Sequence, residues 1–226
     1  DPNALIVPAP PKQAGVKALF SKDYRSATAG IWLTYFSGCF IVYGINAWLP
    51  SLMLEKGLNL SSAYGLAIAQ NAAAVIANCS TGFVAEIIGR KFNLVFSFAV
   101  SAIAVIIMAT VGGSYAAILA ACIFLGFAVN YAITAVQPLM AESYPTEFRN
   151  TGVSWCQAFG RLGGASAPIV AGIVIGMGLG YSMSFMFYVI PALIGAVAAW
   201  IFIKKETKGK SLDQLAEEEN KGSIVM

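Results

Sequence analysis

Arg161 is a cation inside a long apolar segment, at about 151–176. It lies about ten residues into that segment, which at 1.5 Å per residue is ~15 Å, near the middle of a ~30 Å hydrocarbon core. A cation at that depth costs a few kcal/mol unless it meets an anion or water. Apart from Glu86, close to the end of 64–88, the chain has no acidic residue inside any of its long apolar segments. We therefore expect Arg161 to meet an anionic ligand, with an acidic residue on a further chain as the alternative.

Polar side chains recur at helical spacing in four apolar segments. Asn130, Thr134 and Gln137 are spaced i, i+4 and i+7, which places them on one face of a helix. The other three sets are Tyr35, Cys39, Tyr43 and Asn46; Asn71, Asn78 and Thr81; and Ser154, Gln157, Arg161 and Pro168. Because such groups are costly in hydrocarbon, we expect the four segments to line one cavity. The predicted ligand-binding residues are Arg161, Gln157, Tyr35, Tyr43, Asn46, Asn71, Asn130 and Gln137. The alternative is hydrogen bonding between packed helices, which uses the same residue types.

Two further apolar segments, 92–112 and 181–203, have no such stripe. Neither carries Asn, Gln or a charge in its interior, since Asn93 stands at the very start of the first. We therefore expect both segments to be peripheral and to face lipid.

Residue types that support metal or nucleophilic chemistry are scarce. The chain has no His, which removes the commonest metal ligand and the usual neutral-pH proton shuttle. Cys39, Cys79, Cys122 and Cys156 lack the close pairing of zinc sites, and we expect them to be buried and inert. The sequence predicts no metal, no cofactor and no enzyme activity.

Composition sets the class of protein. Hydrophobic residues make up 58% and charged residues 11% of the 226 residues, against about 45–50% and about 25% in soluble domains. A net charge of +3 without a clustered basic face excludes nucleic acid as a partner. Segments long enough to cross a bilayer fall at about 27–52, 64–88, 92–112, 115–140, 151–176 and 181–203. These long runs lack the alternation of barrel strands, so the prediction is an all-α integral membrane protein, a bundle of six transmembrane helices.

Basic residues give the orientation in the bilayer. Lys56 is the only one on the side of the first, third and fifth loops, and the other side carries Lys12, Lys17, Lys22, Arg25, Arg90, Lys91, Arg149, Lys204, Lys205, Lys208, Lys210 and Lys221. The positive-inside rule then makes both termini cytoplasmic in a multi-pass protein, which we expect in the plasma (inner) membrane. The predicted divisions are a cytoplasmic linker at 1–25, the bundle at 26–204 and a cytoplasmic tail at 205–226. Within the tail, 212–219 is predicted to be a short amphipathic helix.

Three motifs resemble the major facilitator superfamily. Residues 82–91 (GFVAEIIGRK) are similar to its Gly, Asp-Arg, Gly-Arg-Lys loop, with Glu86 in place of Asp and Ile87 in place of Arg. Residues 138–149 (PLMAESYPTEFR) resemble its Pro, Glu, aromatic-Pro-Thr and Arg signature, and 206–212 (ETKGKSL) the tail of sugar porters. Their order resembles that of the C-terminal six-helix half of a twelve-helix transporter.

The resemblance implies a function and a partner. It implies alternating access around a site shared with an N-terminal six-helix half, in the lipid bilayer. Residues 43–50 and 159–163 most resemble proton-coupled symporters of aromatic or organic acids, so the implied substrate is a small organic anion. A cytoplasmic gate is expected at Glu86, Gly89, Arg90, Glu142 and Arg149. The half chain offers no proton carrier, which would then lie in the other half.

Two other functions stay open at this point. A sugar porter is favoured by 44–46 and by the tail, but a neutral hexose does not need the charge of Arg161. A self-contained channel or membrane scaffold is the alternative from another class, although no selectivity filter or repeated pore charge is visible in the sequence.

Overall fold

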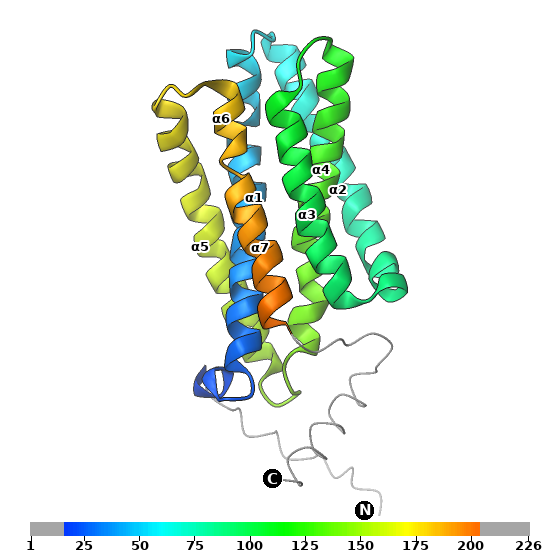
Figure 1. Ribbon diagram of the computed structural model, residues 1–226, viewed down its shortest axis with the longest axis vertical. Helices are drawn as coiled ribbons and strands as arrows, with labels where there is room; N and C mark the ends of the chain where they lie inside the picture. The colour runs from blue at the N-terminus through cyan, green and yellow to red at the C-terminus, as the bar shows by residue number, and fades with distance from the viewer. Residues whose placement is uncertain (1–15, 204–226) are drawn as a thin grey trace, which may run out of the picture.

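The computed structural model describes residues 16–203, and these form a bundle of helices that run nearly parallel (Figure 1). A short 3-10 helix, η1 (Val16–Phe20), precedes α1 (Arg25–Glu55), α2 (Leu60–Ile88), α3 (Arg90–Thr110), α4 (Tyr115–Glu142), α5 (Arg149–Gly176), α6 (Gly180–Met186) and α7 (Val189–Phe202). Six helical stretches are long and apolar enough to cross a membrane, with α6 and α7 together making the sixth. The predicted all-α bundle of six membrane-crossing helices is confirmed, with no strand among the described residues.

The connections between helices are short. Asn59 and Ser114 cap α2 and α4 through their side-chain oxygens, which accept from the backbone N–H groups of Ser62 and Ala117. Gly89 forms the one-residue joint between α2 and α3 at φ +92°, a conformation that side-chain-bearing residues rarely adopt. The start of α1, the α2–α3 joint, the α4–α5 loop and the end of α7 therefore lie at one end of the bundle, which we call the basic end.

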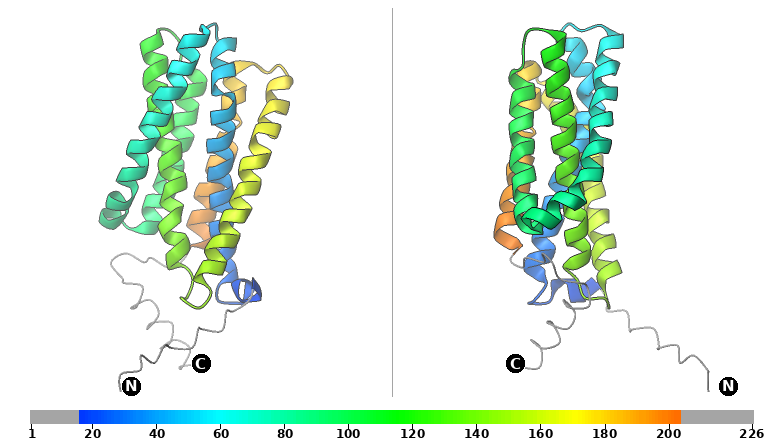
Figure 2. Two further views of the ribbon diagram at one scale, coloured as in Figure 1. Left: turned by 180° about the vertical axis from the view of Figure 1, so that it is seen from behind. Right: turned by 90° about the vertical axis from the view of Figure 1, so that its right-hand side faces the viewer.

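α1 and α4 are the central helices of the bundle. α1 packs mainly against α5 and α7, and α4 packs mainly against α2 and α3 (Figure 2). Close approach depends on glycine: a Cβ on Gly126 of α4 would lie 2.3 Å from the carbonyl oxygen of Gln70, and one on Gly163 of α5 2.6 Å from that of Phe36. Helix pairs in membranes pack closely through small residues of this kind.

The sixth span is broken where the sequence predicted one continuous helix. α6 ends at Met186 and α7 begins at Val189, with two turn residues between them. Pro191 explains the break, because it has no N–H to donate to the carbonyl of Phe187 and its ring crowds that carbonyl. The backbone compensates with tighter bonds, Tyr188 N–H to Phe185 O at 2.9 Å and Ile190 N–H to Phe187 O at 3.3 Å.

The faces of α3 and α6–α7 that point out of the bundle are apolar. Their exposed side chains include Phe96, Ile103, Ile106, Leu193 and Val197. α2 and α5 also expose apolar side chains, among them Ile76 and Ile169, so the expectation that the third and sixth segments face lipid stays a prediction. Asn93 is a correction to that picture: it is 1% exposed near the start of α3, and its Oδ1 accepts a 2.7 Å hydrogen bond from the Tyr131 hydroxyl of α4.

Lys56 connects three helices at the end of the bundle opposite the basic end. Its ammonium donates to the carbonyl oxygen of Val111 and lies 4.0 Å from the ring centroid of Tyr181. It thereby joins the end of α1 to the end of α3 and the start of α6. Burial lowers the pKa of Lys56 below its usual value.

The predicted linker and tail lie largely outside the described residues. Of 1–25, residues 16–25 are described, and η1 packs there beneath the α4–α5 loop, where Leu19 is buried with Tyr144 and Phe148. The tail at 205–226, with its predicted helix at 212–219, lies outside the described residues.

Candidate functional site

Arg161 is exposed near the middle of α5. It lies twelve residues after Arg149, which is ~18 Å along the helix. Within 16–203 no side chain or backbone group forms a hydrogen bond or ion pair with its guanidinium. Ser154 and Gln157 are exposed on the same side of α5, one to two turns before it. The described residues thus present a mid-span cation on an open polar face.

A row of glycines on α5 lets aromatic residues of α1 pack against α5 close to Arg161 in the sequence. A Cβ on Gly160 would lie 2.4 Å from the ring of Tyr35 and 3.0 Å from the sulfur of Cys39. A Cβ on Gly164 would lie 2.8 Å from the ring of Tyr43. Because these glycines flank Arg161 in the sequence, Tyr35 and Tyr43 lie against the helix on either side of it.

Trp48 extends this row towards the opposite end of the bundle. Its indole nitrogen donates a 2.9 Å hydrogen bond to the carbonyl oxygen of Pro168, and its ring packs against Gly172. The bond fixes α1 to α5 at the point where Pro168 interrupts the backbone ladder of α5. Tyr35, Tyr43 and Trp48 of α1 are therefore held in place by contacts with the backbone and glycines of α5.

A hydrogen bond carries the polar surface from α1 to α4. The Gln137 amide donates to the Tyr35 hydroxyl at 3.3 Å, and both groups are open to the surface. Tyr35 thus contacts α5 through its ring and α4 through its hydroxyl. Gln137 and Tyr35 are thus linked to each other, and the Tyr35 ring packs beside Gly160, the residue before Arg161. We call Gln137, Tyr35 and Arg161 the polar strip.

A second polar group lies between α1, α2 and α4. The Gln70 amide donates to Asn46 Oδ1 at 2.9 Å, while Gln70 Oε1 is buried without a partner among the described residues. Asn71 and Asn130 donate to carbonyl oxygens of their own helices, those of Ala67 and Gly126. The hydrogen bond between Gln70 and Asn46 joins two helices. It is the kind of bond that the sequence offered as the alternative to a ligand cavity. Gln70 itself had no place in the predicted stripes, although Gln within an apolar segment is a signal that would have found it.

Three residues of the predicted stripes and cysteine set differ from expectation. Thr81 is 1% exposed and bonds back to Ala77 O, and Cys39 is 2% exposed, so neither faces an open cavity. Cys39 packs beside Gly160 of α5. Cys79 is exposed, in contrast to the expectation that every cysteine is buried. Cys39, Cys122 and Cys156 are buried as expected.

The predicted gate residues lie at the basic end, and two of them form an ion pair. Arg90, the first residue of α3, bonds Glu142, the last residue of α4, at 3.0 Å. The expected salt bridge between an acid and an arginine of these two loops is therefore confirmed. Gly89 forms the joint before α3, whereas Glu86 is exposed and makes no ion pair within the described part of the chain.

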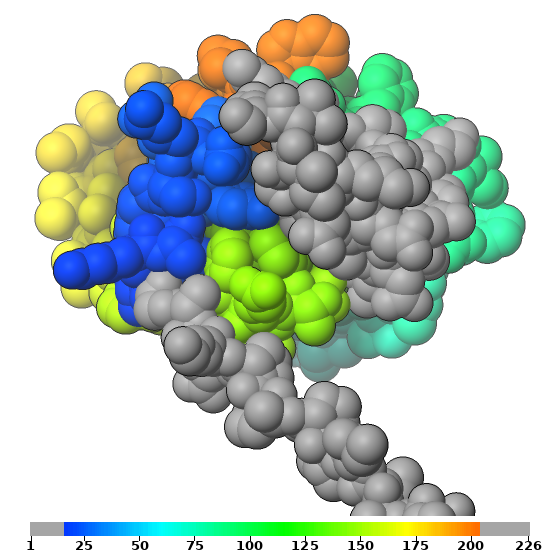
Figure 3. Space-filling view, turned by 90° about the horizontal axis from the view of Figure 1, so that it is seen from below, coloured from blue at the N-terminus to red at the C-terminus, as the bar shows by residue number. Residues whose placement is uncertain are grey.

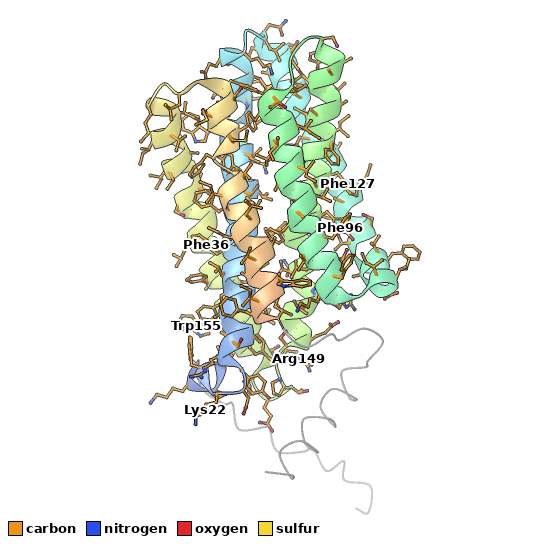
Figure 4. All side chains as sticks on the ribbon, in the orientation of Figure 1. Lys22, Phe36, Phe96, Phe127, Arg149 and Trp155 are labelled. Carbon is orange, nitrogen blue, oxygen red and sulfur yellow. The ribbon has the colours of Figure 1, made fainter. Side chains whose placement is uncertain are left out.

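Arg149 has a different kind of partner. Its Nε donates to the carbonyl oxygen of Tyr144 at 3.2 Å, and the Tyr144 hydroxyl reaches Thr28 of α1 at 3.2 Å. Burial raises the pKa of Tyr144 to about 12. In Figures 3 and 4 the α4–α5 loop lies beside the start of α1, and Arg149 lies at that end of the bundle. The loop is thus tied to α1 through Tyr144.

The side chains around Arg161 can be described by the chemical groups they present. Among the described residues no three His, Cys, Asp or Glu side chains gather to hold a metal ion. What the strip offers is a guanidinium with free donors, amide groups and aromatic surface. Such a set is suited to a small planar anion.

Six membrane-crossing helices with polar side chains gathered on four of them define a multi-pass membrane protein of the transporter kind. A sequence profile described as Major Facilitator Superfamily matches residues 31–224. The chain belongs to the Major Facilitator Superfamily.

Several proteins similar to this chain are transporters of small aromatic compounds. The chain is 28% identical to a gallate transporter of Pseudomonas putida, over 82% of this chain and 41% of that protein. It is 32% identical to the 4-hydroxybenzoate transporter PcaK of Acinetobacter baylyi, over 88% of this chain and 44% of that protein. It is 30% identical to a putative niacin/nicotinamide transporter of Bacillus subtilis, over 88% and 49%. The chain spans less than half the length of these relatives, and their being transporters confirms that the chain is not an enzyme.

Solved structures support the fold alone. The bundle matches a crystal structure of a peptide transporter POT in complex with sulfate, with a TM-score of 0.72 at 20% identity, over 96% of this chain and 45% of that one. It matches a tetrameric PepTSo2 structure with a TM-score of 0.72 at 13% identity, over 88% and 47%.

Proposed function

We propose that this chain is the C-terminal six-helix half of a secondary transporter that takes up a small organic anion, such as an aromatic acid. The observation that carries the proposal is Arg161, an exposed cation at mid-span with no hydrogen bond or ion pair in the described part of the chain. The names of the gallate and 4-hydroxybenzoate transporters support the aromatic acid as substrate.

The proposed binding mode follows from the side chains around Arg161. The planar guanidinium holds the substrate carboxylate by two parallel hydrogen bonds and stays charged when desolvated. The rings of Tyr35 and Tyr43, held against α5 by Gly160 and Gly164, offer flat surface to an aromatic ring. Gln157, Gln137, Asn46, Asn71 and Asn130 supply amide groups for hydroxyl substituents.

The second wall of the site comes from a partner with the same architecture. In the proposed mechanism an N-terminal six-helix half faces the polar strip, and the two halves rock to open the site to each side in turn. Residues 16–203 hold no His and no acid in the interior of a span. Proton coupling therefore requires a proton carrier on the N-terminal half.

We infer that the basic end is the cytoplasmic end, in the plasma (inner) membrane. The exposed cations Lys17, Lys22 and Arg25 lie there, whereas Lys56 is the only described cation at the opposite end. This asymmetry supports a positive-inside orientation. The Arg90–Glu142 pair and the Arg149–Tyr144 bond then form the cytoplasmic gate together with Gly89 and Glu86, closed in one state and broken in the other.

The test is uptake of labelled 4-hydroxybenzoate by the complete transporter that contains this chain. Arg161→Ala is expected to raise KM about 10–100-fold, because one or two charge-assisted hydrogen bonds are lost. Arg161→Lys keeps the charge but not the fork, and is expected to lose less. Leu162→Ala, an exposed neighbour on the same helix, serves as the control, with surface expression measured for each variant. Unchanged uptake by Arg161→Ala would overturn the anion site, and saturable uptake of a labelled hexose would favour a sugar porter instead.

A further inference from the structure

An apolar groove runs along the outer surface of the bundle between α1 and α7. It has a volume of about 270 Å³ and is lined by Leu33, Leu193, Ile194, Val197, Ala198 and Phe202. Leu33 comes from α1 and the other five from α7, and none of the six belongs to the proposed substrate site around Arg161. The groove is therefore separate from the proposed substrate site.

Contacts between α1 and α7 fix the floor of the groove. A Cβ on Gly30 would lie 2.5 Å from the Cβ of Phe202, so glycine alone allows α7 to come this close. Ser26 donates to the carbonyl oxygen of Phe202 at 3.5 Å and Thr34 to that of Gly195 at 3.4 Å. Above this floor Leu33 is 38% and Val197 53% exposed. The groove is thus a preformed furrow that opens to the surrounding membrane.

The groove has the length and position of one lipid leaflet. From Leu193 to Phe202 the helix rises ~14 Å, and half of a ~30 Å hydrocarbon core is ~15 Å. It begins near the middle of the span and ends at the basic end, where α7 stops. Trp155 and Trp200, with exposed fractions of 47% and 62%, lie in the part of α5 and α7 nearest that end. Exposed tryptophans of this kind mark the level of lipid headgroups.

The charge at the mouth of the groove is positive. Arg25 is exposed at the start of α1, and the ammonium of Lys91 lies 5.1 Å from the ring centroid of Trp200 on α7. Lys17 and Lys22 are exposed at the same end of the bundle. Arg25 is the residue next to Ser26, whose hydroxyl contacts the end of α7. In Figure 4 the labelled Lys22 lies at the same end, beside the start of α1.

We propose that this groove binds one acyl chain of an anionic phospholipid from the leaflet at the basic end, with the phosphate held near Arg25. The apolar lining matches the chain and the positive mouth matches the headgroup. Basic residues near an anionic membrane surface are attracted to its headgroups. The groove therefore favours an anionic lipid over a zwitterionic one of the same chain length.

The test is lipid retention by the full-length protein. Protein reconstituted in equal amounts of phosphatidylglycerol and phosphatidylcholine with identical chains is extracted, and bound lipids are counted by native mass spectrometry. The wild type is expected to retain one phosphatidylglycerol in preference to phosphatidylcholine. Val197→Trp, which fills the groove, is expected to abolish that retention. Ile103→Trp on α3 is the matched control, because Ile103 is also 53% exposed, and it should behave as the wild type.

Two charge variants test the headgroup without filling the groove. Arg25→Gln is expected to lower the ratio of phosphatidylglycerol to phosphatidylcholine about fivefold, the equivalent of ~1 kcal/mol, and Arg25→Lys should preserve it. Arg25 is an exposed residue, so its replacement leaves the fold intact if Val197→Trp fails to express. Equal retention of both lipids by the wild type, or no response to Arg25→Gln and Val197→Trp, would overturn the proposal. Retention of a polypeptide with no lipid would assign the groove to a protein partner and overturn it as well.

Discussion

Two faces of the bundle cross the same membrane with opposite chemistry. The polar face carries the exposed residues Asn71, Asn78, Gln137, Gln157 and Arg161, on α2, α4 and α5. The apolar face carries the exposed residues Phe96, Ile103, Ile190, Leu193 and Val197, on α3 and α7. Both kinds of helix are apolar enough overall to span a bilayer. α2 and α5 have a lower mean hydropathy than α3 and the sixth span, and their few polar groups show which side of each helix is costly to place in hydrocarbon.

The largest expected effect comes from placing one acid on each face. Ile103→Asp puts a carboxylate among lipid-facing side chains and should cost about 2.5–3.5 kcal/mol at mid-membrane depth. Ala165→Asp puts the same group one turn after Arg161, where the two can pair. We expect the first variant to lose most of its folded yield in size-exclusion chromatography. The second should keep that yield but lose anion uptake, because its carboxylate occupies Arg161. Equal yields for both would break the distinction between the faces.

The seam that builds the polar face should be sensitive to a single methyl group. Gly160→Ala would force the ring of Tyr35 and the sulfur of Cys39 away from α5, and overpacking of this kind costs about 1–3 kcal/mol. The matched control is Gly176→Ala in the same helix, where a Cβ meets nothing within 4 Å. Thermal unfolding of the two purified variants measures the effect. A midpoint for Gly160→Ala as high as that of Gly176→Ala would mean that α1 and α5 are not held in this register.

The Arg90–Glu142 pair joins the apolar α3 to α4 at the basic end. Glu142→Gln should lower the free energy of unfolding by about 1 kcal/mol, because the pair is only partly buried and is weakened by salt. Glu86→Gln, which removes an exposed acid from the same end, should stay within about 0.5 kcal/mol of the wild type. Chemical denaturation of both variants at low and at high ionic strength measures this difference in the free energy of unfolding. If the difference between the variants persists unchanged in high salt, the pair is not electrostatic in origin.

The smallest expected effect is on the unfolding midpoint when one hydrogen bond is removed, either on the apolar side or on the polar side of the bundle. Ser101 donates to Ala128 O at 2.9 Å in the buried contact between α3 and α4, and such bonds average about 0.6 kcal/mol in membrane proteins. Thr134 donates to Asn78 at 2.7 Å where both are open to the surface. Ser101→Ala should therefore lower the unfolding midpoint slightly, whereas Thr134→Val should not change it. A larger loss from Thr134→Val would show that the polar face is dry in the assembled protein.

The sequence by itself determined the spans and the charge inside them. Length and apolar character were enough to predict six membrane helices, because a bilayer leaves no other way to satisfy the backbone of such segments. Arg161 was identified because an unpaired cation is conspicuous in an apolar segment. The Arg90–Glu142 contact was also predictable, since both belong to motif loops at the same end of the bundle.

Tertiary structure decided which polar residues face outward and which pack inside. Thr81 and Cys39 belong to the same predicted stripes as Asn71 and Tyr43, yet they are buried, because the glycine contacts set how far each helix is rotated. Asn93 and Gln70 became internal hydrogen-bonding groups only when α3 and α2 met their neighbours. Pro191 was readable as a helix breaker, but the tighter bonds that accommodate it depend on the packed bundle. Periodicity fixes where a residue lies around its own helix, and only the contacts between helices fix which way that side points.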